Sequence, residues 1–178
     1  GIEGKVFDVD VLKSFAAKGP MINKRVKKET GIDLKKTGDN LKDPENVSKM
    51  HEIISDFLNL PDKRQGKFFA SVLGASPDRK PNIIFDVTLK DLRKLEKITR
   101  QVSSIGYDKQ NIHIVWVVND IEVAKAQNTK RDRVVPESIV ISSWKSVQNN
   151  IGKFNSLFKS GMIIVDNNKA DEDIEMMA

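Results

Sequence analysis

Acidic and amide side chains follow the apolar runs of this sequence. If these runs are strands of a parallel sheet, the side chains lie at the carboxyl ends of the strands, where such sheets bind their ligands. They are Asp8 and Asp10 after the first run, Asp86 after the second, Asn119 and Asp120 after the third, and Asp166, Asn167 and Asn168 after the fourth. Such carboxylates can hold Mg²⁺ or accept a proton from an attacking hydroxyl. The alternative is structural, because Asp and Asn are also favoured as caps of the helices that follow strands.

Three of these carboxylates are the strongest candidates. Asp8 and Asp10 are two residues apart, so on a strand both would face the same side of the sheet. We expect this pair to act on a hydroxyl, with Asp10 as the metal ligand. Asp86 closes the run Asn82-Ile83-Ile84-Phe85-Asp86, which has the form of a Walker B strand.

A basic segment is the second candidate. Lys130, Arg131 and Arg133 lie close together between two expected helices, where the segment could close over a phosphate. The planar fork of arginine suits phosphoryl oxygens better than the lysine ammonium does. The alternative is a solvated surface loop.

Four apolar runs predict the strands that position these residues. They are rich in Val, Ile and Phe and show little polar alternation, which is typical of strands buried on both faces of a parallel sheet. The runs cover residues 5–9, 82–87, 112–118 and 162–165. The sequence therefore predicts an α/β fold, with a mainly parallel sheet flanked by helices.

Helix signals separate the strands. Thr88 predicts a capped start for a helix that continues through Val102, and Gly106 stands where its C-terminal cap belongs. Pro44, Pro61 and Pro136 predict further helix starts. We expect one domain over residues 1–168, a basic loop or insertion over 18–42, and a flexible acidic tail over 169–178.

Composition narrows the classes of function. The chain has 39% hydrophobic and 31% charged residues, a net charge of +5, two histidines and no cysteine. This excludes disulfides and cysteine chemistry, and neither a membrane span nor a signal peptide is recognisable, so we expect a cytoplasmic protein with no membrane partner. The basic residues 18–42 could attract nucleic acid or nucleotide phosphates, or form a solvated face.

In this order, the motifs resemble those of the zeta-toxin-like P-loop kinases, a group that includes many kinases of bacteria and their phages. The matching segments are 4–13 with its Asp-x-Asp, 82–89 with Val87 in place of a glycine, Gly106-Tyr107 before the strand at 112–118, the lid-like 124–136, and 154–168 ending in Asp-Asn. Together they span nearly the whole chain. The resemblance implies a three-layer sandwich whose first strand is missing here.

The resemblance also implies roles and ligands. Asp8 or Asp10 would be the general base, and Asp86 would hold the acceptor or the metal. Arg131 and Arg133 would steady the γ-phosphoryl group, and Lys130 and Asp120 would contact the nucleotide. The donor would be ATP or GTP with Mg²⁺, and the acceptor would be a hydroxyl of a small molecule or nucleotide.

The phosphate-binding loop of that family would precede Lys5, and these residues contain no Gly-x-x-x-x-Gly-Lys-[Ser/Thr] motif. One hypothesis is a kinase whose loop segment is absent here, which makes the chain as given inactive. A second is a non-catalytic, pseudokinase-like module whose sheet is completed by a protein partner in a larger assembly. A third is a nucleic-acid-binding domain that uses residues 18–42.

Overall fold

The computed structural model describes residues 4–168, and the expected acidic tail lies outside them. Contacts divide the chain into two compact units, and the expected single domain over residues 1–168 stays a prediction. The first unit holds residues 4–87 and 130–136, and the second holds 88–129 and 137–168. The division arises because each unit has its own pair of strands, its own helices and its own buried cluster.

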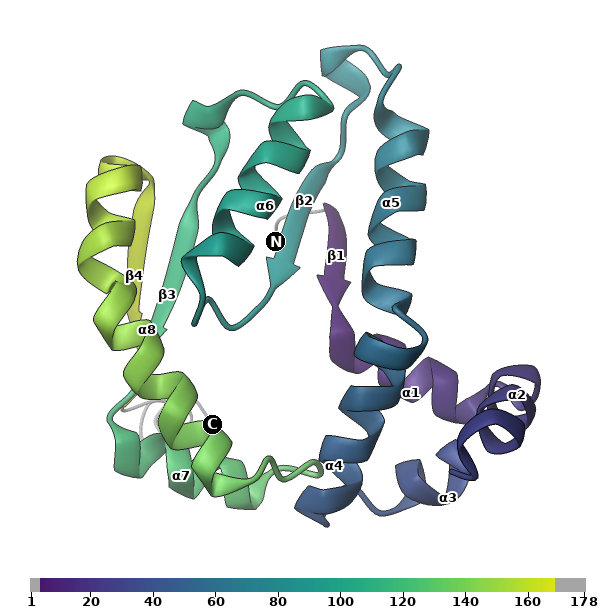
Figure 1. Ribbon diagram of the computed structural model, residues 1–178. Coiled ribbons are helices and arrows are strands. Elements are labelled where there is room, and N and C mark those ends of the chain that lie inside the picture. Colours follow the sequence, from purple (N-terminus) through teal and green to yellow (C-terminus); the bar gives the residue numbers. More distant parts are fainter. Residues whose placement is uncertain (1–3, 169–178) are drawn as a thin grey trace, which may run out of the picture. The chain divides into compact units, whose positions relative to one another are not determined.

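The sheet of the first unit consists of β1 (Gly4–Asp8) and β2 (Asn82–Asp86), which pair in parallel with Asp8 opposite Asp86. Helix α5 (Leu60–Val72) runs beside them (Figure 1). The Phe7 and Phe85 rings stack with centroids 5.3 Å apart, and the Phe68 ring of α5 meets Phe7 edge-on at 5.4 Å. These aromatic contacts hold α5 against one face of the strands.

The remaining helices of the first unit form a cluster after β1. They are α1 (Val9–Lys18), α2 (Pro20–Thr30), α3 (Leu34–Asp39), α4 (Pro44–His51) and the π-helical segment η1 (Glu52–Phe57). Their shared core includes the fully buried Ala16, Val26, Leu34 and Ile54. Pro44 begins α4 as predicted, and α5 begins one residue before Pro61.

The prediction of a loop over residues 18–42 is wrong, because α2 and α3 occupy most of it. Pro20 provides a preset φ at the first position of α2, and Gly31 ends that helix with φ of 77°. Asp33 then caps α3. Both helices are amphipathic enough to bury Val26 and Leu34, although charged residues dominate their sequence.

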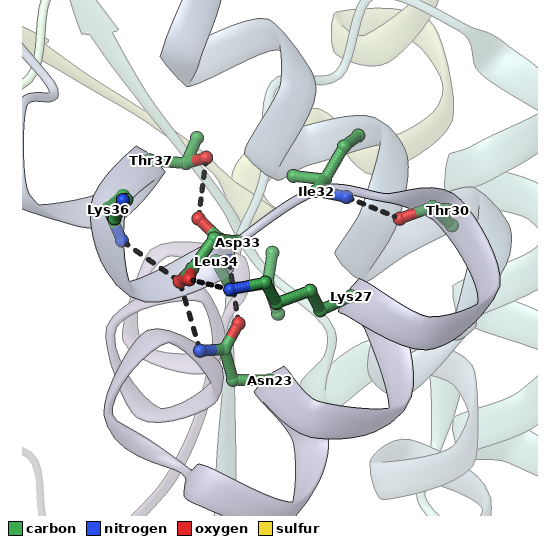
Figure 2. A network of polar contacts seen from close by, with 8 residues as sticks. All are labelled: Asn23, Lys27, Thr30, Ile32, Asp33, Leu34, Lys36 and Thr37. Carbon is green, nitrogen blue, oxygen red and sulfur yellow. Dashed lines mark hydrogen bonds and ion pairs between the residues drawn. The ribbon is translucent and has the colours of Figure 1, made fainter.

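Asp33 is the centre of the polar network that joins α2 to α3, and Figure 2 shows its partners. Asn23 Nδ2 donates to Asp33 Oδ1 at 3.0 Å, and Lys27 Nζ lies 3.1 Å from Oδ2. The backbone N–H of Leu34 donates back to Asn23 Oδ1 at 2.8 Å. These bonds fix the start of α3 against the side of α2.

Asp33 should make this joint sensitive to acid. The hydrogen bond from Asn23, followed by that from Lys27, lowers the Asp33 pKa from 3.8 to about 2. A carboxyl group whose pKa is lower in the folded than in the unfolded state stabilises the fold at pH values above its unfolded pKa. This stabilisation is lost as the pH falls from about 4 to about 2. We expect Asp33→Asn to lower the urea midpoint at pH 7, and this difference from wild type to shrink below pH 4.

The control is Asp39→Asn on the same helix, at an exposed position. It should leave the urea midpoint close to that of wild type at both pH values. If the difference in urea midpoint between Asp33→Asn and wild type stays constant down to pH 2, the charge of Asp33 does not stabilise the contact between α2 and α3.

The second unit has the same kind of sheet, formed by β3 (Ile114–Val118) and β4 (Met162–Asp166) in parallel. Its longer helices are α6 (Leu92–Ser104), α7 (Ile121–Lys130) and α8 (Glu137–Phe158). Its core joins Leu95 of α6, Ile114 of β3 and Phe154 of α8. Short 3₁₀ turns complete the described residues, η2 (Pro77–Arg79) in the first unit and η3 (Lys109–Asn111) and η4 (Lys159–Gly161) in the second.

One predicted cap is displaced in this unit. Helix α6 is capped by Asp91, whose carboxylate accepts from the N–H of Arg93 at 2.9 Å, and not by Thr88. Asp outcompetes Thr because its charged oxygen interacts with the positive end of the helix dipole. Gly106 follows the helix with φ of 86°, as its predicted role in the C-terminal turn requires.

The α/β fold and all four predicted strands are confirmed, and both strand pairs are parallel. The predicted burial on both faces is wrong for both units. In the first unit, Val6 of β1 and its partner Ile84 of β2 are exposed. Val115 and Val117 of β3 and their partners Ile163 and Val165 of β4 are all exposed. The three-layer kinase sandwich stays a prediction, since the strands described form two two-stranded sheets.

Candidate functional site

The carboxyl edge of β1 and β2 brings two predicted residues together. Asp8 ends β1 and Asp86 ends β2, and the register sets them opposite one another. Neighbouring strands lie about 4.8 Å apart, and paired residues project from the same face. The two carboxylates therefore share one edge and one face of the sheet.

Asp8 also caps the helix that follows. Its Oδ1 accepts from the N–H of Asp10 at 2.7 Å, and α1 begins at Val9. The expected strand geometry of Asp8 and Asp10 is therefore wrong, because the strand ends between them. Capping and chemistry are compatible here, since the cap uses one of the two carboxylate oxygens of Asp8.

Asp10, in the first turn of α1, is bound by two cations. Lys13 Nζ lies 3.2 Å from its Oδ1, and Arg133 Nη1 donates to the same oxygen. The Lys13 side chain is 8% exposed, while that of Asp10 is 44% exposed. The result is a compact cluster of one carboxylate and two cations beside Asp8.

Lys13 is a member of this cluster that the sequence analysis did not identify. Burial, the largest effect, lowers the pKa of its ammonium, and the nearby Arg133 lowers it further, while Asp10 opposes both. The signal in the sequence is its spacing, since a lysine three residues after an aspartate on a helix lies next to it.

Arg133 reaches Asp10 because its segment is anchored to the first unit. The N–H of Val134 donates to the carbonyl of Leu41 at 2.9 Å, and Lys42 Nζ donates to the carbonyl of Arg131. Arg131 itself is exposed on this segment. Arg133 thus lies beside an acidic candidate, and the predicted roles of Arg133, Arg131 and Lys130 stay predictions.

The candidates of the second unit have structural partners. Asp120 precedes α7, its carbonyl accepts from Ala124 N–H at 2.9 Å, and its own N–H donates to Asn168 Oδ1 at 2.6 Å. Trp144 Nε1 donates to the carbonyl of Asn119 at 2.8 Å. Asp166 Oδ1 accepts from Asn168 N–H at 3.0 Å. These bonds favour the structural interpretation of this strand edge, and a nucleotide contact by Asp120 stays a prediction.

The residues fit a phosphotransferase in part. Within residues 4–168 there is no cluster of three or more acidic or histidine side chains suited to a metal ion, and two cations already neutralise Asp10. The described chain also has no glycine-rich loop to cradle a nucleotide's phosphates. What it does offer is paired carboxylates for a hydroxyl and an arginine for an anion.

Comparisons with protein-family models, with curated proteins and with solved structures found no match to this chain. No helix within residues 4–168 has both the length and the apolar character needed to span a bilayer.

Proposed function

We propose that the first unit binds the acceptor in a phosphotransferase reaction. In this reaction a γ-phosphoryl group moves from ATP or GTP with Mg²⁺ to a hydroxyl of a small molecule or nucleotide. The observation that carries the proposal is the pairing of Asp8 and Asp86 at one sheet edge, next to the Asp10–Arg133 contact. The motif resemblance supports the same assignment.

The arrangement divides the work among these residues. Asp10 is neutralised by Lys13 and Arg133, so Asp8 and Asp86 are the carboxylates suited to bind the acceptor hydroxyl and take its proton. Asp10 holds Arg133 in place, since a bound guanidinium keeps one orientation. Arg133 then presents its remaining N–H groups to incoming phosphoryl oxygens. The donor supplies the phosphoryl group and its metal.

The test is phosphoryl transfer by the natural protein that contains these residues, with γ-labelled ATP, Mg²⁺ and nucleosides or sugar nucleotides as acceptors. Loss of a general base costs about 10²–10⁴-fold in rate. One of Asp8 and Asp86 is the general base, and its replacement by asparagine should lower kcat about 10²–10⁴-fold. The other binds the acceptor, and its replacement by asparagine should raise KM.

The control is Asp108→Asn, because Asp108 caps η3 in the second unit and belongs to no part of the proposed site. It should retain the wild-type rate. Transfer at the wild-type rate by both Asp8→Asn and Asp86→Asn would remove the basis for the proposal.

A non-catalytic module is the second candidate, and the exposed aliphatic face of β3 and β4 favours it. Parallel strands are usually covered on both faces, so a protein partner on this face would complete the unit. Under this alternative the natural protein transfers no phosphoryl group, and Val117→Lys abolishes assembly with the partner without unfolding the chain.

A further inference from the structure

The positive charge of the chain is concentrated on one part of the first unit. Residues 18–42 contain eight lysines and arginines against three acidic residues, a net charge of +5. The whole chain also has a net charge of +5, so all other residues together sum to zero. Because most of this stretch forms α2 and α3 rather than a loop, the helical backbone sets where most of its charged side chains begin.

The lysines form an exposed surface on these helices. Lys24 and Lys28 lie four residues apart on α2, hence on one side of it, and Lys35 and Lys36 lie on α3. All four are exposed and make no ion pair with a described residue, in contrast to Lys27, which binds Asp33. The Asp33 network joins the two helices, so the lysines of α2 and α3 belong to one joined part of the first unit (Figure 2).

An aromatic side chain lies on the helix that leads from this surface to the candidate site. Phe15 of α1 is 66% exposed, and Lys18 follows three residues later on the same helix. Helix α1 begins directly after Asp8 and is about 15 Å long at 1.5 Å per residue. A ligand on α2 and α3 that also follows α1 would need to span about 15 Å to reach Asp8.

We propose that the surface of α1, α2 and α3 binds single-stranded nucleic acid, with its terminal hydroxyl at Asp8 as the phosphoryl acceptor. The assignment of the acceptor rests on the proposed function, whereas the binding surface does not. Lysines that follow a backbone, together with an aromatic ring on which a base can stack, are the features of single-strand sites.

An anionic membrane is a poorer fit to the same surface. A helix that lies in a membrane interface has a continuous apolar face opposite its charged face. The exposed residues of α2 are charged, apart from Pro20 and Met21 at its start. The side of α2 that is apolar is buried through Val26.

The experiment measures the fluorescence anisotropy of a labelled single-stranded oligonucleotide with the full chain, between about 50 and 200 mM salt. The wild type should bind with an affinity that falls as salt rises. Lys24→Glu with Lys28→Glu should weaken binding at least about tenfold and reduce the salt slope by about 1.4, since each lost phosphate contact contributes about 0.7. Phe15→Ala should weaken binding at least about fivefold.

The matched control is Lys145→Glu with Lys153→Glu on α8, at two exposed positions of the second unit. This pair changes the net charge by the same amount, and should keep the affinity within about twofold of wild type at equal salt. Circular dichroism confirms that each variant is folded. An equal loss in both pairs, absence of binding by the wild type, or binding to phosphatidylserine vesicles in place of the oligonucleotide would overturn the proposal.

The two proposals fail in distinguishable ways. If the chain binds the oligonucleotide and the natural protein phosphorylates no hydroxyl, the binding surface stands and the proposed function falls. If small-molecule hydroxyls are phosphorylated and the oligonucleotide does not bind, the binding surface falls and the proposed function stands.

Discussion

Replacement of Phe154 by alanine should lower the free energy of unfolding of the second unit by about 3–5 kcal/mol, the usual cost of emptying a buried aromatic site. Phe154 of α8 is 1% exposed and packs with Leu95 and Ile114, so the substitution leaves a cavity at the centre of this core. Urea unfolding followed by tryptophan fluorescence measures the change, because Trp116 and Trp144 both lie in this unit.

Leu157 provides the control on the same helix, since its side chain is 65% exposed. Leu157→Ala should change the free energy of unfolding by less than about 0.5 kcal/mol. Similar losses at both positions would mean that Phe154 is not the centre of the core.

Replacement of Asp10 by asparagine should destabilise the first unit by about 2 kcal/mol. The change leaves Lys13, which is buried, and Arg133 beside each other without the carboxylate that both contact, and removing one partner of a buried pair costs about 3–5 kcal/mol. The cost is reduced here because the Asp10 side chain is 44% exposed and water screens part of the repulsion.

A second substitution isolates the cause. Lys13→Met removes the buried cation, so the double variant with Asp10→Asn should recover most of the lost stability in a double-mutant cycle. Glu45→Gln, which breaks the exposed 2.7 Å pair with Lys49, should cost less than about 0.5 kcal/mol. An additive double variant would show that Lys13 and Asp10 do not interact.

The strands could be predicted because the length and composition of their sequences favour a strand over a helix. Runs such as Ile114 to Val118 are too short for a helix, consist of β-branched and aromatic residues, and recur between helix signals. Their exposure could not be predicted in the same way. Apolar side chains on both faces show that a strand can pack against apolar elements on both sides. Whether it is buried depends on which other elements of the chain pack against it.

The helices of residues 18–42 were missed because charge dominated the interpretation of that stretch. The local signals were present, with Pro20 at a helix start and Asp33 three residues before Lys36, whose N–H its carboxylate accepts at 3.4 Å. Short helices depend on tertiary packing for most of their stability, and the burial of Val26 and Leu34 is a property of the assembled cluster.

The sequence predicted the strand-end aspartates of the candidate site but not the contacts that Asp10 makes with Lys13 and Arg133. Sequence spacing indicated that Asp8 and Asp86 would lie near strand ends, which is where the register puts them. The contact between Asp10 and Arg133 joins residues 123 positions apart, and nothing in the local sequence specifies such a pairing. Lys13 was missed because a lysine on a helix is expected to be solvated.

The segment 130–136 has a consequence for biosynthesis. It belongs to the first unit although α7 and α8, on either side of it, lie mainly in the second. While the ribosome makes residues 4–87, the strands and helices of the first unit can form, yet Lys13 and Asp10 must wait for Arg133, and Leu41 for Val134. The first unit is therefore completed only after translation has passed residues 88–129, about half of the second, so the formation of the two units overlaps in time.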